Sequence, residues 1–125
     1  MIKGIGVDII EIDRIERAIK KSKARFIKRV FTQAEEAYCL SRPQPFRHFA
    51  VRFAAKEAVS KALGTGKIGL RWTDIEVCHD KRGRPFIKLL GDGAERAEER
   101  GVGAVEISLS FNRETAIASA VATST

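Results

Sequence analysis

The sequence has few cysteines, few aromatic residues and no long apolar segment. Its 125 residues include two cysteines, Cys39 and Cys78, and 7% aromatic residues. The cysteines form no CxxC pair, which argues against a zinc site or a disulfide framework and predicts two reduced thiols. The longest uncharged run, residues 115–125, is far shorter than the roughly 20 apolar residues of a membrane-spanning helix, and no apolar targeting segment stands out. We therefore expect a cytoplasmic protein with no membrane partner.

Other absences narrow the organisation and the chemistry. There is no low-complexity linker and no internal repeat, so we expect one domain spanning residues 1–125. No nucleophile elbow or Ser-His-Asp arrangement supports covalent hydrolysis. The glycine-rich stretch 64–69 lacks the spacing of a phosphate-binding loop and is expected to follow a helix, so it predicts a helix stop and a flexible connection. His48 and His79 are isolated from other metal ligands.

What the chain does have is a local excess of positive charge. Lysine and arginine total 23, aspartate and glutamate total 16, and the formal net charge is +7. Residues 14–29 hold eight basic side chains and one acid, so this window accounts for the whole excess. The basic residues are Arg14, Arg17, Lys20, Lys21, Lys23, Arg25, Lys28 and Arg29. A single basic patch on an otherwise neutral chain favours an acidic partner that docks at one place.

The patterns in the first half predict a strand and three helices. A strand is expected over residues 2–12, with glycines on one face that let a backbone or a ligand approach. Asp13 is a candidate N-cap for a helix over residues 14–30. Thr32 and Glu35 form a capping box for a short helix that ends before Pro43. A long helix over residues 46–63 is expected to end at Gly64.

The second half reads mainly as antiparallel strands. We expect strands over residues 74–78 and 86–90, a helix over residues 92–100 that ends at Gly101, and a final pair of strands over residues 105–110 and 115–122. The predicted fold class is therefore α+β, with a mostly antiparallel sheet, one long central helix and shorter helices.

Glu57 is the main anomaly of the long helix. The apolar positions of this helix are Phe46, Phe49, Ala50, Phe53 and Ala54, and Glu57 and Ala58 continue the same stripe. A carboxylate on a buried face is costly unless a cation meets it. Either Lys61, one turn later, pairs with Glu57, or the carboxylate binds a metal ion.

Asp8 is the second anomaly, because it interrupts an apolar strand on the face that carries glycines. It is either an ordinary solvent-facing residue or a functional carboxylate. Asp8 and Glu57 together, with Lys61 nearby, suit a hard divalent cation that holds phosphate oxygens. Mg²⁺ uses only one or two protein carboxylates and completes its shell with water and substrate phosphate.

Several motifs resemble those of the holo-[acyl-carrier-protein] synthases, the small phosphopantetheinyl transferases. Residues 4–11 (GIGVDIIE) with Arg14 resemble the N-terminal motif of that family, and residues 52–66 (RFAAKEAVSKALGTG) resemble its specific second motif. Residues 72–77 and 83–85 are similar to its middle region, and residues 108–110 followed by 115–118 are similar to its C-terminal motif. The resemblance covers nearly the whole chain.

This resemblance implies the 4′-phosphopantetheinyl transferase fold and a Mg²⁺-dependent transfer. The 4′-phosphopantetheine group would move from coenzyme A to a serine of apo acyl carrier protein, as fatty acid biosynthesis requires. Asp8 and Glu57 would be metal ligands and, with Lys61, the catalytic residues. The implied coenzyme A-binding residues are Arg52, Lys61, Gly64, Gly83, Pro85 and Asn112. The resemblance also implies a homotrimer whose active sites lie between neighbouring subunits.

The basic patch then has an implied partner, the acidic acyl carrier protein. Arg14, Arg25 and Phe26 stand at positions that match the docking helix of the family. The base that takes the serine proton stays open between a metal-bound water and a water held by Glu35 or Glu36.

The chain departs from the family at Phe111, where the family usually has a histidine that is associated with coenzyme A phosphate binding. Asn112 or Arg113 can substitute for it, or coenzyme A binds more weakly.

Two alternatives to a working transferase remain. One is a catalytically weak relative that only binds acyl carrier protein. The other is a small basic nucleic-acid-binding module, although scarce aromatic residues and the lack of a recognition motif argue against a nucleic-acid partner.

Overall fold

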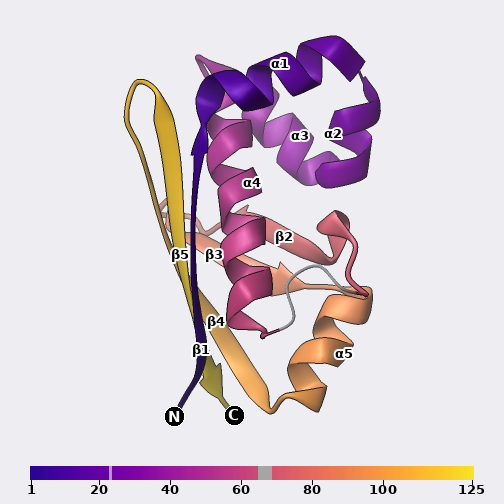
Figure 1. Cartoon of the computed structure of the whole chain (residues 1–125), viewed down its shortest axis with the longest axis vertical. Helices are drawn as coiled ribbons and strands as arrows, with labels where there is room; N and C mark the ends of the chain where they lie inside the picture. The colour runs from indigo at the N-terminus through magenta and orange to yellow at the C-terminus, as the bar shows by residue number, and fades with distance from the viewer. Residues whose placement is uncertain (23, 65–68) are drawn as a thin grey trace.

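The computed structural model describes residues 1–22, 24–64 and 69–125. The elements are, in chain order, β1 (Ile2–Glu11), α1 (Ile12–Ser22), α2 (Ala24–Val30), α3 (Gln33–Leu40), α4 (Pro45–Ala62), the 3₁₀ turn η1 (Trp72–Asp74), β2 (Ile75–His79), β3 (Pro85–Leu89), α5 (Gly91–Glu99), β4 (Val102–Phe111) and β5 (Thr115–Ser124). In Figure 1, α1, α2 and α3 gather at one end of the long helix α4, and α5 lies towards the other end.

The strands form two antiparallel sheets. The larger sheet has the order β1-β5-β4, and β2 and β3 form a separate hairpin. Alternate alanines of β5, namely Ala116, Ala118, Ala120 and Ala122, are buried in the core with the inner face of α4. This architecture confirms the predicted α+β class, with α4 as the central helix (Figure 1).

The glycine face of β1 is where the strand meets α4. A Cβ atom added at Gly4 would lie 2.0 Å from the backbone oxygen of Ala62, and one added at Gly6 would lie 2.0 Å from the backbone oxygen of Ala58. Both distances are far below van der Waals contact, so only glycine fits at either position. The expectation that these glycines admit a neighbouring backbone is confirmed, and that backbone belongs to α4.

The start of the first helix differs from the prediction. α1 begins at Ile12, directly after β1, and Asp13 lies inside its first turn rather than capping it from outside. The Ile12 N–H donates a hydrogen bond to the Glu114 carbonyl at 2.9 Å. The carbonyl of Glu114, just before β5, thus pairs one of the backbone N–H groups that a helix start leaves without an intrahelical partner.

The prediction of a single helix over residues 14–30 is also wrong, because this segment forms two helices, α1 and α2. The Ser22 hydroxyl donates to the Ala18 carbonyl at 2.9 Å and accepts from the Phe26 N–H at 3.2 Å. A side-chain oxygen that replaces a backbone acceptor in this way ends one helix and begins the next. Lys23 lies outside the described residues.

The signals that bound α3 and α4 are confirmed. Thr32 Oγ1 accepts from the Glu35 N–H at 3.2 Å, and Glu35 Oε1 accepts from the Thr32 N–H at 2.9 Å, which completes the capping box. α4 ends at Ala62, and Gly64 follows with φ of 95°, as expected of a glycine stop. The connection predicted over residues 64–69 falls mostly on residues 65–68, which lie outside the described residues.

The predicted strands of the second half are confirmed to within a few residues. β2 and β3 pair from Ile75 with Leu89 to His79 with Pro85. α5 is followed by Gly101, which has φ of 69°. Asn112 closes the β4–β5 turn, since its Oδ1 accepts hydrogen bonds from the backbone of Glu114 at 3.0 Å and of Thr115 at 2.8 Å.

The outer face of the larger sheet is apolar and exposed. Ile5, Val7 and Ile9 of β1 are 71%, 56% and 64% exposed. Across the sheet, Ile5 pairs with Val121 and Ile9 pairs with Ile117. The helices lie on the other side of this sheet (Figure 1). Among the described residues, no helix is both long and apolar enough to cross a membrane.

Replacing Gly6 with alanine tests the backbone contact between β1 and α4. The new methyl group would meet the carbonyl of Ala58, and a helix backbone cannot yield locally. We expect Gly6→Ala to lower the free energy of unfolding by about 3 kcal/mol, measured by urea denaturation. Lys3→Ala, at an exposed position of the same strand, is the control and should change it by less than about 0.5 kcal/mol. An unchanged Gly6→Ala midpoint would contradict the close contact.

Candidate functional site

The contact between β1 and α4 places Asp8 next to Lys61. Lys61 Nζ lies 3.7 Å from Asp8 Oδ1 and donates a hydrogen bond to the Val7 carbonyl at 3.0 Å. The Asp8 side chain is only 20% exposed, whereas that of Lys61 is 51% exposed. Burial raises the pKa of Asp8, and the neighbouring Lys61 ammonium offsets part of that rise. Two of the three predicted catalytic residues are thus brought together.

Glu57 lies one turn before Lys61 on α4 and is half-buried. Its backbone carbonyl accepts from Ser60 Oγ at 2.9 Å. Within residues 1–22, 24–64 and 69–125, however, its carboxylate forms no hydrogen bond or ion pair. The ion pair between Glu57 and Lys61 that the spacing allowed is not formed there, because Lys61 turns to Asp8 instead.

These two carboxylates fit Mg²⁺ in their chemistry. Both offer hard oxygen donors, one in a partly dehydrated position and the other without a protein partner among the described residues. The described part of the chain holds no group of three or more possible metal ligands. Mg²⁺ uses one or two carboxylates together with water and phosphate, so two such oxygen donors are enough for it.

Two charged residues that precede Glu57 on α4 are buried in the core. Lys56 is fully buried and Arg52 is 1% exposed, at positions that precede Glu57 by one and five residues. Arg52 was expected at a ligand surface, and Lys56 was not among the predicted site residues. The signal that would have revealed both is their spacing of four residues on one helix, each directly after two apolar residues.

Glu35 is not available as the holder of a catalytic water. Its carboxylate is buried, and it accepts hydrogen bonds from the Thr32 N–H at 2.9 Å, the Val77 N–H at 2.8 Å and Lys56 Nζ at 2.7 Å. Both oxygens are thus occupied by the protein. This part of the sequence prediction is corrected.

Arg52 lies at the wall of a cavity of about 400 Å³ that also includes the predicted residue Pro85. The other lining residues are Tyr38, His48, Val51, His79, Leu109, Ser110 and Phe111. The Arg52 guanidinium stacks 4.2 Å from the Tyr38 ring centroid, and its Nη1 donates to the His48 carbonyl at 3.1 Å. Its buried Nε has no hydrogen-bond partner within the described ranges. A buried, partly unpartnered guanidinium is suited to a phosphate group.

Two histidines complete this cavity, and the sequence analysis assigned neither a role. His79 stacks on Tyr38 at 4.5 Å, and a ring nitrogen of His79 lies 3.2 Å from Arg52 Nη2. Burial, reinforced by nearby arginines, lowers the pKa of His48 to about 4, and burial also lowers the pKa of His79. Both rings are therefore neutral near pH 7, and Arg52 supplies the positive charge. The spacing of four residues between His48 and Arg52 was the available sequence signal.

Phe111, which departs from the family pattern, separates this cavity from a larger one of about 700 Å³. The Arg47 guanidinium lies 4.8 Å from the centroid of the Phe111 ring, and His48 contacts the ring edge-on at 5.8 Å. Asn112 and Arg113 line the larger cavity. Positive charge and an imidazole thus remain beside position 111, although the residue there is phenylalanine.

Gly64 and Gly83 both have positive φ angles, of 95° and 85°. A Cβ at Gly83 would meet nothing within 4 Å, so glycine is required there by the backbone angle rather than by space. The turn is held by Asp80, whose Oδ1 accepts from the N–H groups of Arg82 and Arg84, each at 2.9 Å. It leaves the surface before Pro85 open.

The predicted docking residues lie on α1 and α2. Arg14 and Arg25 are exposed, while the apolar residues Ile15 and Ile19 on the opposite side of α1 are buried. Phe26 is half-buried and lines a hollow of about 650 Å³. The other residues of this hollow are Ala18, Lys21, Ser22, Arg25 and Arg29. An apolar floor with a basic rim suits an acidic, amphipathic partner.

One copy of the chain does not bring all predicted residues together. Arg52 and Glu57 are five residues apart on α4, which turns them about 140° from each other around the helix. The residues that line the Arg52 cavity do not include Asp8, Glu57 or Lys61. Glu57, a predicted metal ligand, and Arg52, a predicted coenzyme A-binding residue, therefore lie on different faces of α4.

Comparisons with known proteins identify the family of this chain. The family model of the 4′-phosphopantetheinyl transferase superfamily matches residues 4–120. A holo-[acyl-carrier-protein] synthase of Alkaliphilus metalliredigens is 47% identical over 123 residues, which is 98% of this chain and 100% of that protein. The crystal structure of the synthase from Neisseria meningitidis is 36% identical, with a TM-score of 0.91 over 98% of this chain and 99% of that one.

A structure of the Helicobacter pylori synthase in complex with coenzyme A is 32% identical, with a TM-score of 0.84 over 95% of this chain and 99% of that one. The matches extend along nearly the whole chain and include both the sequence motifs and the fold. The chain therefore belongs to the 4′-phosphopantetheinyl transferase superfamily and, within it, to the holo-[acyl-carrier-protein] synthases.

Proposed function

We propose that this transferase moves 4′-phosphopantetheine from coenzyme A to a serine of an acidic acyl carrier protein in a Mg²⁺-dependent reaction. The serine oxygen forms a bond to the phosphorus that carries pantetheine, and the pyrophosphate bond breaks to release adenosine 3′,5′-bisphosphate. The observation that carries this proposal is the contact between β1 and α4, which puts Lys61 Nζ 3.7 Å from Asp8 Oδ1, with Glu57 one turn before Lys61 on the same helix.

Asp8 and Glu57 are the residues that would hold Mg²⁺. When bound, Mg²⁺ neutralises charge on the pyrophosphate oxygens and helps to orient them for in-line attack. Asp8 is partly dehydrated, so its carboxylate gains from a nearby cation. Glu57 has no competing partner among the described residues, so its oxygens are free to bind.

Lys61 is placed to contact the substrate phosphates. An ammonium group has three donors. One donates to the Val7 carbonyl and one faces Asp8 at 3.7 Å, which leaves one for a phosphate oxygen. Because Lys61 is half-exposed, a substrate can reach it. Its charge stabilises the pyrophosphate as negative charge develops on the leaving nucleotide.

The Arg52 cavity suits the nucleotide end of coenzyme A. Its guanidinium offers a buried positive charge for a phosphate, and the rings of Tyr38, His79 and Phe111 offer flat apolar surfaces for a purine. Related synthases from Helicobacter pylori and Bacillus anthracis are described in complex with coenzyme A. Gly64, Gly83, Pro85 and Asn112 stay candidates for backbone or amide contacts to the same ligand.

A homotrimer would join the two separated groups of residues into complete sites. The exposed apolar face of Ile5, Val7 and Ile9 is the surface that a second copy would cover, since monomeric proteins rarely expose an apolar patch of this kind. The angle of about 140° between Arg52 and Glu57 around α4 supports sites shared between neighbouring subunits.

The basic surface of α1 and α2 would dock the acidic carrier protein, with Arg14, Arg25 and Phe26 at its centre. A role in fatty acid biosynthesis follows from this choice of acceptor. A cytoplasmic location stays a prediction, supported by the two free thiols, Cys39 and Cys78.

Phosphopantetheine transfer is the direct test of the proposed reaction. The protein is incubated with apo acyl carrier protein, coenzyme A and Mg²⁺, and the carrier is weighed by mass spectrometry. We expect the carrier to gain one phosphopantetheine, and Asp8→Ala or Glu57→Ala to slow the gain by about 100-fold or more. Glu99→Ala, at an exposed position of α5, should match the wild type. Transfer that survives loss of either carboxylate would refute the metal assignment.

Charge reversal at Arg25 tests the docking surface. We expect Arg25→Glu to raise the KM for the carrier protein by about tenfold at low salt, with a much smaller difference at high salt, because salt screens the attraction. The kcat should change little. Lys3→Glu makes the same charge change on an exposed position of β1 and serves as the control. Equal effects of the two variants would place docking elsewhere.

Analytical ultracentrifugation tests the trimer. We expect the wild type to have three times the 13.8 kDa mass of one chain. Ile5→Glu should shift it towards the monomer and lower activity, since a charge on the covered face opposes association. Leu40→Glu changes another exposed apolar residue, 58% exposed on α3, and should keep the trimer. A monomeric, active wild type would show that one copy suffices.

A further inference from the structure

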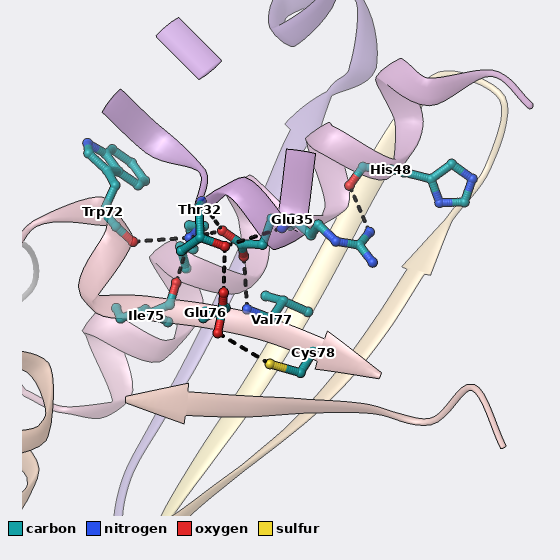
Figure 2. A network of polar contacts seen from close by, with 10 residues as sticks. Thr32, Glu35, His48, Trp72, Ile75, Glu76, Val77 and Cys78 are labelled. Atoms are coloured by element: carbon teal, nitrogen blue, oxygen red, sulfur yellow. Dashed lines mark hydrogen bonds and ion pairs between the residues drawn. The ribbon is translucent and has the colours of Figure 1, made fainter. Parts of the chain in front are cut away.

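A fully buried ion pair joins α3 to α4 immediately before Glu57. Lys56 Nζ lies 2.7 Å from Glu35 Oε1, and neither side chain has any exposed surface. Lys56 also donates to the carbonyl of Trp72 at 3.1 Å and to that of Ile75 (Figure 2). All three of its donors are therefore used, and they reach α3, η1 and β2.

The carboxylate end of this pair is equally well fixed. Glu35 accepts from the backbone N–H of Thr32 and of Val77, at 2.9 and 2.8 Å. Thr32 Oγ1 in turn donates to Glu76 Oε2 at 2.6 Å (Figure 2). The network thus holds the start of α3 against β2, with Lys56 of α4 at its centre.

Stability alone does not account for charges at this place. Replacing a buried ion pair by apolar side chains of similar size is often neutral or stabilising, because dehydrating two charges is costly. A fully bonded pair instead restricts α4 to one orientation, because Lys56 must reach three fixed acceptors at once. Apolar side chains at the same positions would tolerate small rotations of α4 with little cost.

The direction of Lys56 on α4 shows what that arrangement controls. Successive residues of a helix are about 100° apart. Measured from Lys56, Glu57 lies about 100° and Lys61 about 140° around the helix. Ala58 and Ala62, which contact the glycines of β1, lie at about 200° and 240°. Glu57 and Lys61 therefore lie on the flank between two anchors, the ion pair on one side and the β1 backbone on the other.

We propose that Lys56 is a positioning residue, whose buried pair with Glu35 fixes the rotation of α4 so that Glu57 and Lys61 face Asp8. This inference rests on the proposed function of Asp8 and Glu57 as metal ligands. Side-chain ends lie roughly 5 to 6 Å from a helix axis, so a rotation of 20° displaces them by about 2 Å. Mg²⁺ requires near-octahedral geometry at about 2.0 to 2.1 Å, so such a rotation would separate its two ligands.

The test removes both charges together and measures metal binding. Lys56→Met combined with Glu35→Gln avoids leaving one buried charge alone. Mn²⁺ is the probe, and its Kd is measured by electron paramagnetic resonance in the presence of coenzyme A, with a protein-free sample as the blank. Unfolding by urea and the KM for the carrier protein are measured on the same samples. Val59→Ala, at a fully buried residue of α4 outside the network, is the control for general destabilisation.

We expect the double variant to fold and to weaken Mn²⁺ binding by about 10- to 100-fold, the range seen when outer partners of a metal site are lost. The KM for the carrier protein should not change, because α1 and α2 lie outside the network. Val59→Ala should keep the wild-type Kd for Mn²⁺. If the double variant does not fold, Lys56→Gln combined with Glu35→Gln also removes both charges, leaves two neutral amides that can bond to each other, and should still weaken Mn²⁺ binding several-fold.

Either double variant, if it folds and keeps the wild-type Kd, would overturn the positioning role. So would equal weakening by Val59→Ala, since any destabilised core would then have the same effect. In both cases the wild type still binds Mn²⁺, and the proposed metal ligands stand. A wild type that does not bind Mn²⁺ would overturn the proposed function itself, and the positioning role with it.

Discussion

The contact on which the rest of the structure depends is that between the glycine face of β1 and the backbone of α4. Gly4 and Gly6 bring the strand so close to the helix that a methyl group at either position would overlap a helix carbonyl. This closeness places Asp8, the next residue on that face, beside Lys61 of α4. A strand with side chains at positions 4 and 6 would stand further from the helix and would separate the two charges.

The same closeness helps to bury α4 on several sides, whereas a surface helix buries only one face. The larger sheet covers one side, and the β2 strand and α3 contact another through Lys56. Charged residues on such a helix differ in environment according to their direction. Lys56 is fully bonded in the core, Arg52 lines a cavity, and Glu57 is half-buried one turn before Lys61. One helix thus serves two surfaces, which supports the proposal that the sites are shared between copies.

Local signals were reliable wherever the physics is local. The capping box of Thr32 and Glu35 and the glycine stop at Gly64 were predicted from residues within one turn of each other, and the structure contains both. The prediction of one helix over residues 14–30 was wrong, because the Ser22 hydroxyl competes with the backbone for hydrogen bonds. The stripe that contains Glu57 predicted a carboxylate in the core. That prediction assumes a helix with a single buried face, whereas α4 is buried on several sides. On α4 the charged residues buried in the core are Lys56 and Arg52.

The amino-acid order alone predicted the α+β class, most of the elements to within a few residues and the basic surface of the first helices, and it is the source of the proposal that Asp8 and Glu57 act together. These depend on periodicity, on capping chemistry and on motifs that are contiguous in the chain. Only the tertiary structure decided that Lys61 pairs with Asp8 and not with Glu57, that Glu35 is occupied by Lys56, and that His48 and His79 surround Arg52. Those outcomes depend on which face of α4 meets which strand, and packing between segments distant in the chain sets that direction.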